Sequence, residues 1–88
     1  MSIFEEAVRI FGFEAQLKMV EEECAELINA ICKYYRGRNT SADIIEEAVD
    51  VSFMIEQLKF IFPSEMWESI RRDKENRLKA RLAKHAIS

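Results

Sequence analysis

FEAQLKMVEEECAELINAI, residues 13–31, combines a helical hydrophobic pattern with a dense run of acidic residues. Its apolar residues recur every three or four positions, which is the spacing of one face of an α-helix. These residues are Phe13, Leu17, Val20, Cys24, Leu27, Ile28 and Ile31. The stretch therefore predicts a long amphipathic helix with carboxylates beside its buried face.

The composition of the rest of the chain favours helix throughout. The 88 residues predict one domain, 1–88, and 49% of them are hydrophobic, with only two Gly and one Pro. A chain this short buries a modest share of its surface, so we expect an oligomer that pools its core. The net charge of −3 excludes an overall electrostatic attraction to nucleic acid.

Three sequence features indicate a cytoplasmic location. No apolar run approaches the length of a membrane span, so no membrane association is expected. The N-terminal MSIFEEAVRIF contains acids and lacks the basic start of a signal peptide. Cys24 and Cys32 lie eight residues apart on one expected helix, too far for a disulfide, and are expected to be reduced, packed thiols.

Breaks and caps divide the chain into four expected helices, and the fold class is all-α with a four-helix bundle-like protomer. A short helix of two turns opens at Ser2 and ends near Gly12, and longer helices follow at about 13–36, 42–61 and 65–84. Gly37, with Thr40 and Ser41 as capping candidates, marks the first long loop. Pro63 and Ser64 separate the third helix from the fourth. Three aromatic residues near the start, Phe4, Phe11 and Phe13, are expected in the core.

The third expected helix has two apolar faces. One contains Ile44, Ala48, Val51, Ile55, Leu58 and Phe62, and the other contains Ile45, Val49, Phe53 and Phe60. A helix that is apolar on both sides is buried on both sides. We therefore expect the second face to meet another subunit, giving a homodimer or a homotetramer.

Acidic residues interrupt these apolar patterns twice. Glu23 and Glu26 are three residues apart and can reach one point in space, and Glu47 and Asp50 repeat this spacing within or beside an apolar stripe. A lone buried carboxylate costs several kcal/mol unless it is paired or bound to metal. Three interpretations stay open: a solvated acidic face, ion pairs with Lys or Arg, and a cage for Mg²⁺ or Mn²⁺. Neither motif contains a histidine, which disfavours a di-iron site.

The two motifs, E-x-x-E at 23–26 and E-x-x-D at 47–50, resemble those of the MazG-like all-α nucleoside triphosphate pyrophosphohydrolases. Dimeric dUTPases and phosphoribosyl-ATP pyrophosphohydrolases are relatives of that family. The similarity covers about residues 10–82. It implies Mg²⁺-dependent cleavage between the α- and β-phosphates of an NTP or dNTP, giving the monophosphate and pyrophosphate.

The resemblance also implies roles for individual residues. Glu23, Glu26, Glu47 and Asp50 would be metal ligands, and Glu22 would orient or deprotonate the attacking water. Met54 departs from the pattern, because some relatives have a polar residue one turn after the aspartate. This departure weakens any assignment of the contact to the sugar or the leaving group.

Cations in two regions are candidates for binding substrate phosphates. DKENRLKAR, residues 73–81, is similar to the basic tail of the same family and supplies Lys74 and Arg77, with Asn76 on another side of the helix. Near the first loop, Lys33, Arg36 and Arg38 are further candidates. Cations near a helix C-terminus also offset the helix dipole, which is the alternative explanation. Trp67 is expected in the core rather than stacked on a base.

Two functions remain open from sequence. The first is a nucleotide pyrophosphohydrolase acting on a nucleoside triphosphate. The alternative is a non-catalytic helical oligomeric adaptor or regulator, in which the acids form inter-subunit salt bridges with the cations of the fourth helix. In that case a divalent ion would leave the stability of the protein unchanged.

Overall fold

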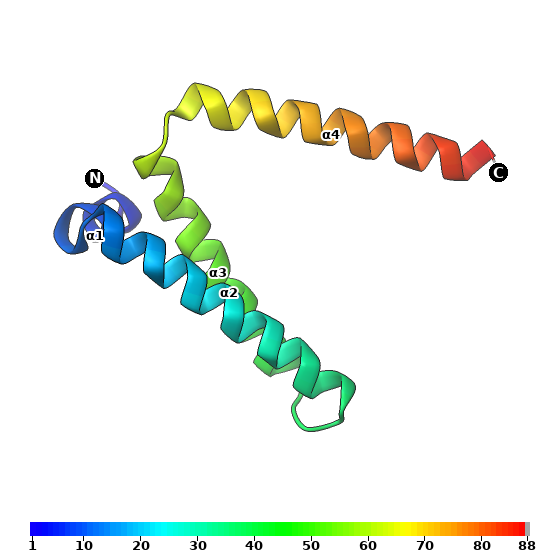
Figure 1. Cartoon of the computed structure of the whole chain (residues 1–88), viewed down its shortest axis with the longest axis horizontal. Coiled ribbons are helices and arrows are strands. Elements are labelled where there is room, and N and C mark those ends of the chain that lie inside the picture. Colours follow the sequence, from blue (N-terminus) through cyan, green and yellow to red (C-terminus); the bar gives the residue numbers. More distant parts are fainter. Residues whose placement is uncertain (88) are drawn as a thin grey trace.

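The computed structural model describes residues 1–87, which form four helices and no strand. The helices are α1 (Ile3–Phe11), α2 (Phe13–Tyr35), α3 (Ser41–Ile61) and α4 (Ser64–Ile87). Figure 1 shows α2 and α3 as an antiparallel hairpin, with α1 near the C-terminal part of α3 and α4 diverging from the hairpin. The all-α prediction is confirmed. The expected boundaries agree to within a residue or so, except that α4 extends three residues beyond its expected end.

Local capping interactions set the helix starts. The Ser2 hydroxyl accepts a hydrogen bond from the Glu5 backbone N–H (3.1 Å) at the start of α1. Of the two capping candidates before α3, Thr40 is the N-cap, and its backbone N–H and hydroxyl both donate to the Asp43 carboxylate (2.8 and 3.1 Å). These caps fix where the chain enters α1 and α3.

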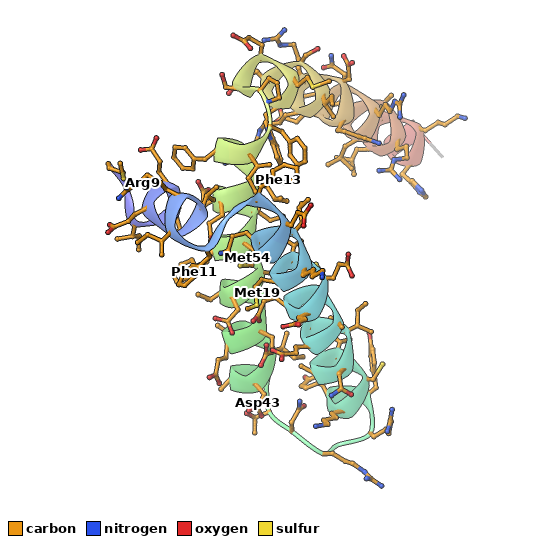
Figure 2. All side chains as sticks on the ribbon, turned by 60° about the vertical axis from the view of Figure 1, so that its left-hand side comes forward. Arg9, Phe11, Phe13, Met19, Asp43 and Met54 are labelled. Atoms are coloured by element: carbon orange, nitrogen blue, oxygen red, sulfur yellow. The ribbon has the colours of Figure 1, made fainter. Side chains whose placement is uncertain are left out.

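The seam between α2 and α3 holds the most buried side chains in the described part of the chain. Ala30 and Met54 are its buried apolar residues, and Figure 2 shows where Met54 lies along α3. Gln16 and Gln57 are also buried, and the Gln16 side-chain amide donates to the Gln57 carbonyl across the seam (2.5 Å). The seam is therefore part apolar and part polar along its length.

Several residues expected in the core are exposed in the single chain. Phe11 and Phe13 are 65% and 50% exposed, so their assignment to the core is wrong for one protomer. For Phe11 the reason is that the short α1 turns only one side inward, where Phe4 is half-buried against Phe53 (ring centroids 5.4 Å apart). Phe13 is the first residue of α2 and is covered on one side only, where its ring meets that of Phe62 (centroids 6.0 Å apart). Cys24 is half-buried but Cys32 is exposed, so only one thiol is partly packed.

The molecule is more open than a compact domain of its size. Its radius of gyration is 16.5 Å, whereas a compact domain of this length has about 12 Å. Its accessible surface is 7187 Å², against about 5,400 Å² for a compact monomer of this mass. The main cause is α4, which contacts α3 near the connection between them and neither α1 nor α2. No helix among the described residues has the length and apolarity needed to cross a membrane.

Candidate metal centre

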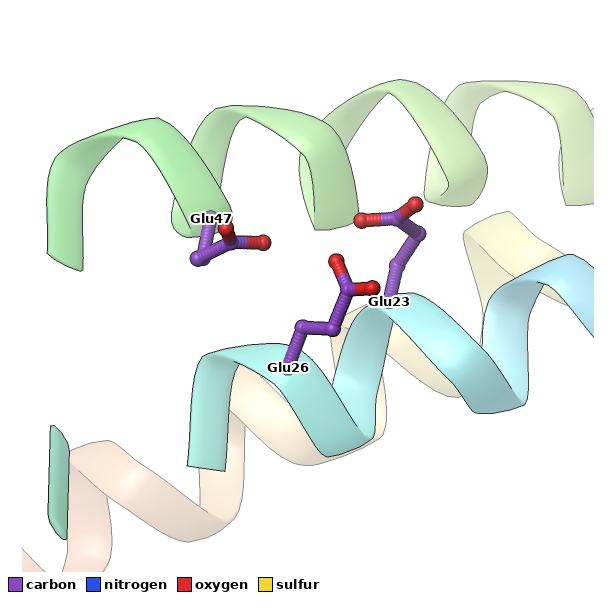
Figure 3. A group of neighbouring side chains, drawn as sticks. All are labelled: Glu23, Glu26 and Glu47. Carbon is purple, nitrogen blue, oxygen red and sulfur yellow. The ribbon is translucent and has the colours of Figure 1, made fainter. Parts of the chain in front are cut away.

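Three carboxylates converge in the α2–α3 seam. Glu23 and Glu26 extend from α2 and Glu47 extends from α3, and Figure 3 shows the three side chains reaching toward one another between the helices. One ligand oxygen from each lies within 4.8 Å of the others. The three-residue spacing on α2 puts its two acids on one side of that helix, and the antiparallel pairing of the hairpin brings Glu47 opposite them.

Among residues 1–87, the cluster has no cationic partner. Glu23 and Glu47 each have a buried carboxylate oxygen, Oε2, with no hydrogen-bond partner. The Lys or Arg ion pairs found in the described part of the chain join Lys59 to Glu56 and Arg71 to Glu75, away from the cluster. Pairing with a cation of the same chain therefore does not explain these acids. A buried acceptor without a partner is unfavourable, which favours a bound cation.

Burial and mutual repulsion favour the protonated forms of two of these acids. Desolvation raises the pKa of Glu23 above its ordinary value of 4.5, and the charges of Glu26 and Asp50 raise it further. Desolvation also raises the pKa of Glu47, followed by a hydrogen bond with Glu26 and the charges of Glu26 and Asp50. A divalent cation between the carboxylates would reverse both effects, because it favours the charged forms.

The donor set fits a small hard cation. Six oxygens at about 2.1 Å around Mg²⁺ place opposite ligands about 4.2 Å apart. The carboxylate oxygens lie within 4.8 Å of one another, so small side-chain rotations would close the set around one ion. Oxygen donors without nitrogen or sulfur suit Mg²⁺ or Mn²⁺. The residues present could therefore hold a divalent cation, as the metal-cage interpretation expects.

The remaining predicted acids surround this triad. Asp50 is half-buried, and its charge acts on both Glu23 and Glu47, so it lies near the cluster without joining the three converging oxygens. Glu22 is exposed on α2, next to Glu23 in the chain. Glu46 is exposed on α3.

A pocket of about 370 Å³ adjoins the cluster and continues toward the α2–α3 loop. Its lining comprises Glu26, Asn29, Ala30, Lys33, Arg38, Asn39, Asp43 and Glu47. Of the predicted phosphate-binding residues, Lys33 and Arg38 line this pocket, whereas Arg36 does not. Sequence reasoning missed Asn29 and Asn39. The spacing of Asn29, three residues after Glu26, is the signal that identifies it as a neighbour of the cluster.

The structure does not bring the α4 candidates to the cluster within one chain. Lys74, Asn76 and Arg77 are exposed on α4, which makes no contact with α2. Their roles in substrate binding stay predictions. Trp67 is half-buried and lines a small apolar pocket of about 250 Å³ at the start of α4, together with Phe62, Met66 and Ile70.

Comparison of this chain with protein-family models, with curated proteins and with solved structures finds no match. Any function of this chain must therefore be inferred from the site itself, because a helical fold by itself does not imply an activity.

Proposed function

We propose that this chain is a Mg²⁺-dependent nucleoside triphosphate pyrophosphohydrolase, as its resemblance to MazG-like enzymes implies. The observation that carries the proposal is the convergence of three carboxylates from two helices, two of them with buried oxygens that have no partner. Hard divalent ions held by carboxylates serve phosphoryl chemistry in many enzymes. The substrate would be an NTP or dNTP, and water would add across the α–β phosphoanhydride to give a monophosphate and pyrophosphate.

Each residue has a defined part in this proposal. Glu23, Glu26 and Glu47 hold Mg²⁺, with Mn²⁺ as the substitute ion, and Asp50 completes the set. When bound, the ion supplies positive charge at the phosphoryl oxygens. Glu22 is solvent-accessible beside the cluster and accepts the proton that the attacking water loses.

Surface area supports a homo-oligomer in which α3 is an interface helix. The second face of α3 is covered only in part by α1, whose Phe4 meets Phe53, and it leaves Ile45 61% exposed and Val49, Phe53 and Phe60 between 42% and 47%. The chain exposes about 1,800 Å² more surface than a compact monomer of its mass. Burying that area on each of two copies would give an interface of the size seen in obligate homodimers. A dimer, or a tetramer built from it, would cover this second face of α3.

A second copy would also give α4 a surface to pack on. An isolated helix in water is marginally stable without tertiary contacts. Packing α4 against another protomer is the route by which Lys74, Arg77 and Asn76 would reach a carboxylate cluster. The proposed location is the cytoplasm, where the free thiols Cys24 and Cys32 would remain reduced.

The decisive experiment is pyrophosphate release across a panel of NTPs and dNTPs that includes dUTP, with Mg²⁺ or with EDTA. Wild type is compared with Glu47→Gln, and Glu46→Gln is the matched control because its side chain is exposed beside the cluster in sequence. We expect metal-dependent pyrophosphate from wild type and from Glu46→Gln, and none from Glu47→Gln. Silence across the panel, with no effect of Mg²⁺ on melting, would favour the non-catalytic adaptor.

A further inference from the structure

The pocket beside the carboxylate cluster is lined by acids of the cluster and, nearer the α2–α3 loop, by two cations and Asp43. Glu26 and Glu47 form the end that belongs to the cluster, and Lys33 and Arg38 lie toward the α2–α3 loop. Lys33 follows Glu26 by seven residues on α2, which places it two turns, or about 10 Å, further along the axis. The Cα–Cβ bond of a helical residue tilts toward the helix N-terminus, which for Lys33 is the direction of the cluster, and Lys33 lines the same pocket as Glu26 and Glu47.

The α2–α3 loop folds back so that Arg38 lies next to Lys33 at the end of α2. The Arg38 backbone N–H donates to the carbonyl of Lys33 (2.9 Å), which brings the two residues side by side. Gly37 makes this reversal with a positive φ of 68°, a conformation that residues with a side chain rarely adopt. The Asn39 side-chain amide then donates to the Ala30 carbonyl (3.0 Å) and ties the loop to α2. The backbone conformation of the loop therefore places Lys33 and Arg38 next to each other.

The charges of the pocket decide what it can bind. Asp43 also lines it, but its carboxylate already accepts two hydrogen bonds from Thr40 at the helix cap. With three acids and two cations, the empty pocket carries a net negative charge and would repel an anion. Glu23 and Asp50 add to this negative charge, and one divalent cation on the cluster would offset two of the charges, so the pocket would accept an anion more readily with the metal than without it.

We propose that Lys33 and Arg38 form a subsite for the diphosphate part of a metal-complexed substrate, the part that leaves as pyrophosphate. This inference deepens the proposed function and depends on it for the identity of the substrate. The α-phosphate then lies at the carboxylate cluster, and the nucleoside extends away from the α2–α3 loop. Two adjacent cations suit a diphosphate because each can donate charge-assisted hydrogen bonds to its oxygens.

The test measures binding of inorganic pyrophosphate by calorimetry in the presence of Mg²⁺, using the full chain. Arg38→Gln and Lys33→Gln are compared with Arg36→Gln, a matched control because Arg36 is an exposed cation of the same loop outside the pocket lining. We expect about tenfold weaker pyrophosphate binding in each of the first two variants, equivalent to about 1.4 kcal/mol. The control should change affinity by about twofold or less, because Arg36 lies outside the pocket lining and acts on the ligand only through screened solvent.

Two further arms separate this subsite from general electrostatic attraction and from a site for the monophosphate. Binding of Mg²⁺ alone should not weaken in Arg38→Gln, because the carboxylates are intact. Binding of nucleoside monophosphates with Mg²⁺ should be the same in Arg38→Gln and wild type. Equal losses in Arg36→Gln and Arg38→Gln, equal losses for monophosphate and pyrophosphate, or no pyrophosphate binding by wild type would each overturn the subsite.

The outcome is distinguishable from a failure of the proposed function. Metal-dependent nucleotide hydrolysis with unchanged pyrophosphate binding in Arg38→Gln would refute the subsite and leave the enzyme. Conversely, pyrophosphate binding that requires Mg²⁺ and Arg38, in a chain that hydrolyses no nucleotide, would support the diphosphate site and refute the hydrolase.

Discussion

Divalent metal should stabilise this protein, and the substitution Glu47→Gln should remove most of that stabilisation. The variant keeps the size of the side chain and one oxygen, but it loses the charge that faces Glu23 and Glu26 across the seam. The folded chain presents the three carboxylates together, whereas the unfolded chain does not. Metal therefore binds the native state in preference and shifts the folding equilibrium toward it.

The size of the effect follows from linkage. Metal at a concentration one hundred times its dissociation constant stabilises the native state by about 2.7 kcal/mol. A domain of this length gains about 4–8 °C in Tm per kcal/mol, so Mg²⁺ should raise the Tm of wild type by about 10–20 °C. If loss of one ligand weakens metal binding about 100-fold, the same Mg²⁺ concentration should raise the Tm of Glu47→Gln by only about 2–3 °C.

The assay is thermal unfolding followed by circular dichroism, with Mg²⁺ or with EDTA at matched ionic strength. Protein concentration is held fixed, because assembly also makes Tm depend on concentration. Glu46→Gln removes a charge from the adjacent, exposed position and should respond to Mg²⁺ as wild type does. Equal shifts in wild type and Glu47→Gln would remove this residue from the site. A wild-type Tm that does not change with Mg²⁺ would refute the metal centre as a whole.

Three further predictions address pH, the polar seam and assembly. In EDTA, stability toward urea should fall as pH rises above 4.5, because the raised pKa of Glu47 keeps a proton on the folded chain that the unfolded chain loses. The stability of Glu47→Gln should depend less on pH. A pH profile identical to that of wild type would contradict this prediction. Gln57→Leu should lower the free energy of unfolding in urea by about 1–3 kcal/mol, because it leaves the buried amide of Gln16 without its hydrogen-bond acceptor. The double variant Gln16→Leu/Gln57→Leu should recover most of that loss. Additive losses would show that the two side chains are not coupled. Ile45→Glu should weaken assembly at least tenfold by sedimentation equilibrium, since it replaces about 1.5–3 kcal/mol of apolar burial with a charge, and an unchanged association constant would exclude this face.

Local signals in the sequence were sufficient for the helices. Ser2 and Thr40 offer side-chain oxygens at helix starts, and Pro63 interrupts the chain between α3 and α4. These interactions join residues a few positions apart, so sequence spacing specifies them. The convergence of Glu23, Glu26 and Glu47 was also predictable, because the spacing puts the acids on defined helix sides and an antiparallel hairpin brings those sides together.

Sequence patterns could not show which apolar residues lie inside one protomer. Phe13 and Leu17 lie on the same apolar stripe of α2, yet Phe13 is exposed and Leu17 is partly buried. A periodic pattern identifies residues that avoid water, but it does not say whether they are covered by the same chain or by another one. The sequence also could not predict the direction of α4, because that direction depends on which surface α4 packs against beyond the connection near Pro63.

The pairing of Lys33 with Arg38 required the path of the loop. The sequence shows a glycine at position 37, and glycine favours a turn in general. Only the positive φ of Gly37 and the backbone bond from Arg38 to Lys33 show that the loop folds back onto the end of α2. The cations near the loop therefore become stronger phosphate candidates than the sequence suggests, relative to those of α4.

The placement of the acids bears on the choice between enzyme and adaptor. An adaptor that forms salt bridges with another subunit needs its acids on the surface, and Glu22 and Glu46 are there already. Glu23 and Glu47 are instead half-buried in the seam, while Glu26 is exposed at its edge, and the core beside them contains little beyond Ala30 and Met54. Carboxylates at such positions weaken the metal-free fold, because they are desolvated and repel one another. A bound divalent cation would convert this cost into stabilisation by coupling metal binding to folding, which the proposed metal site requires and the adaptor does not.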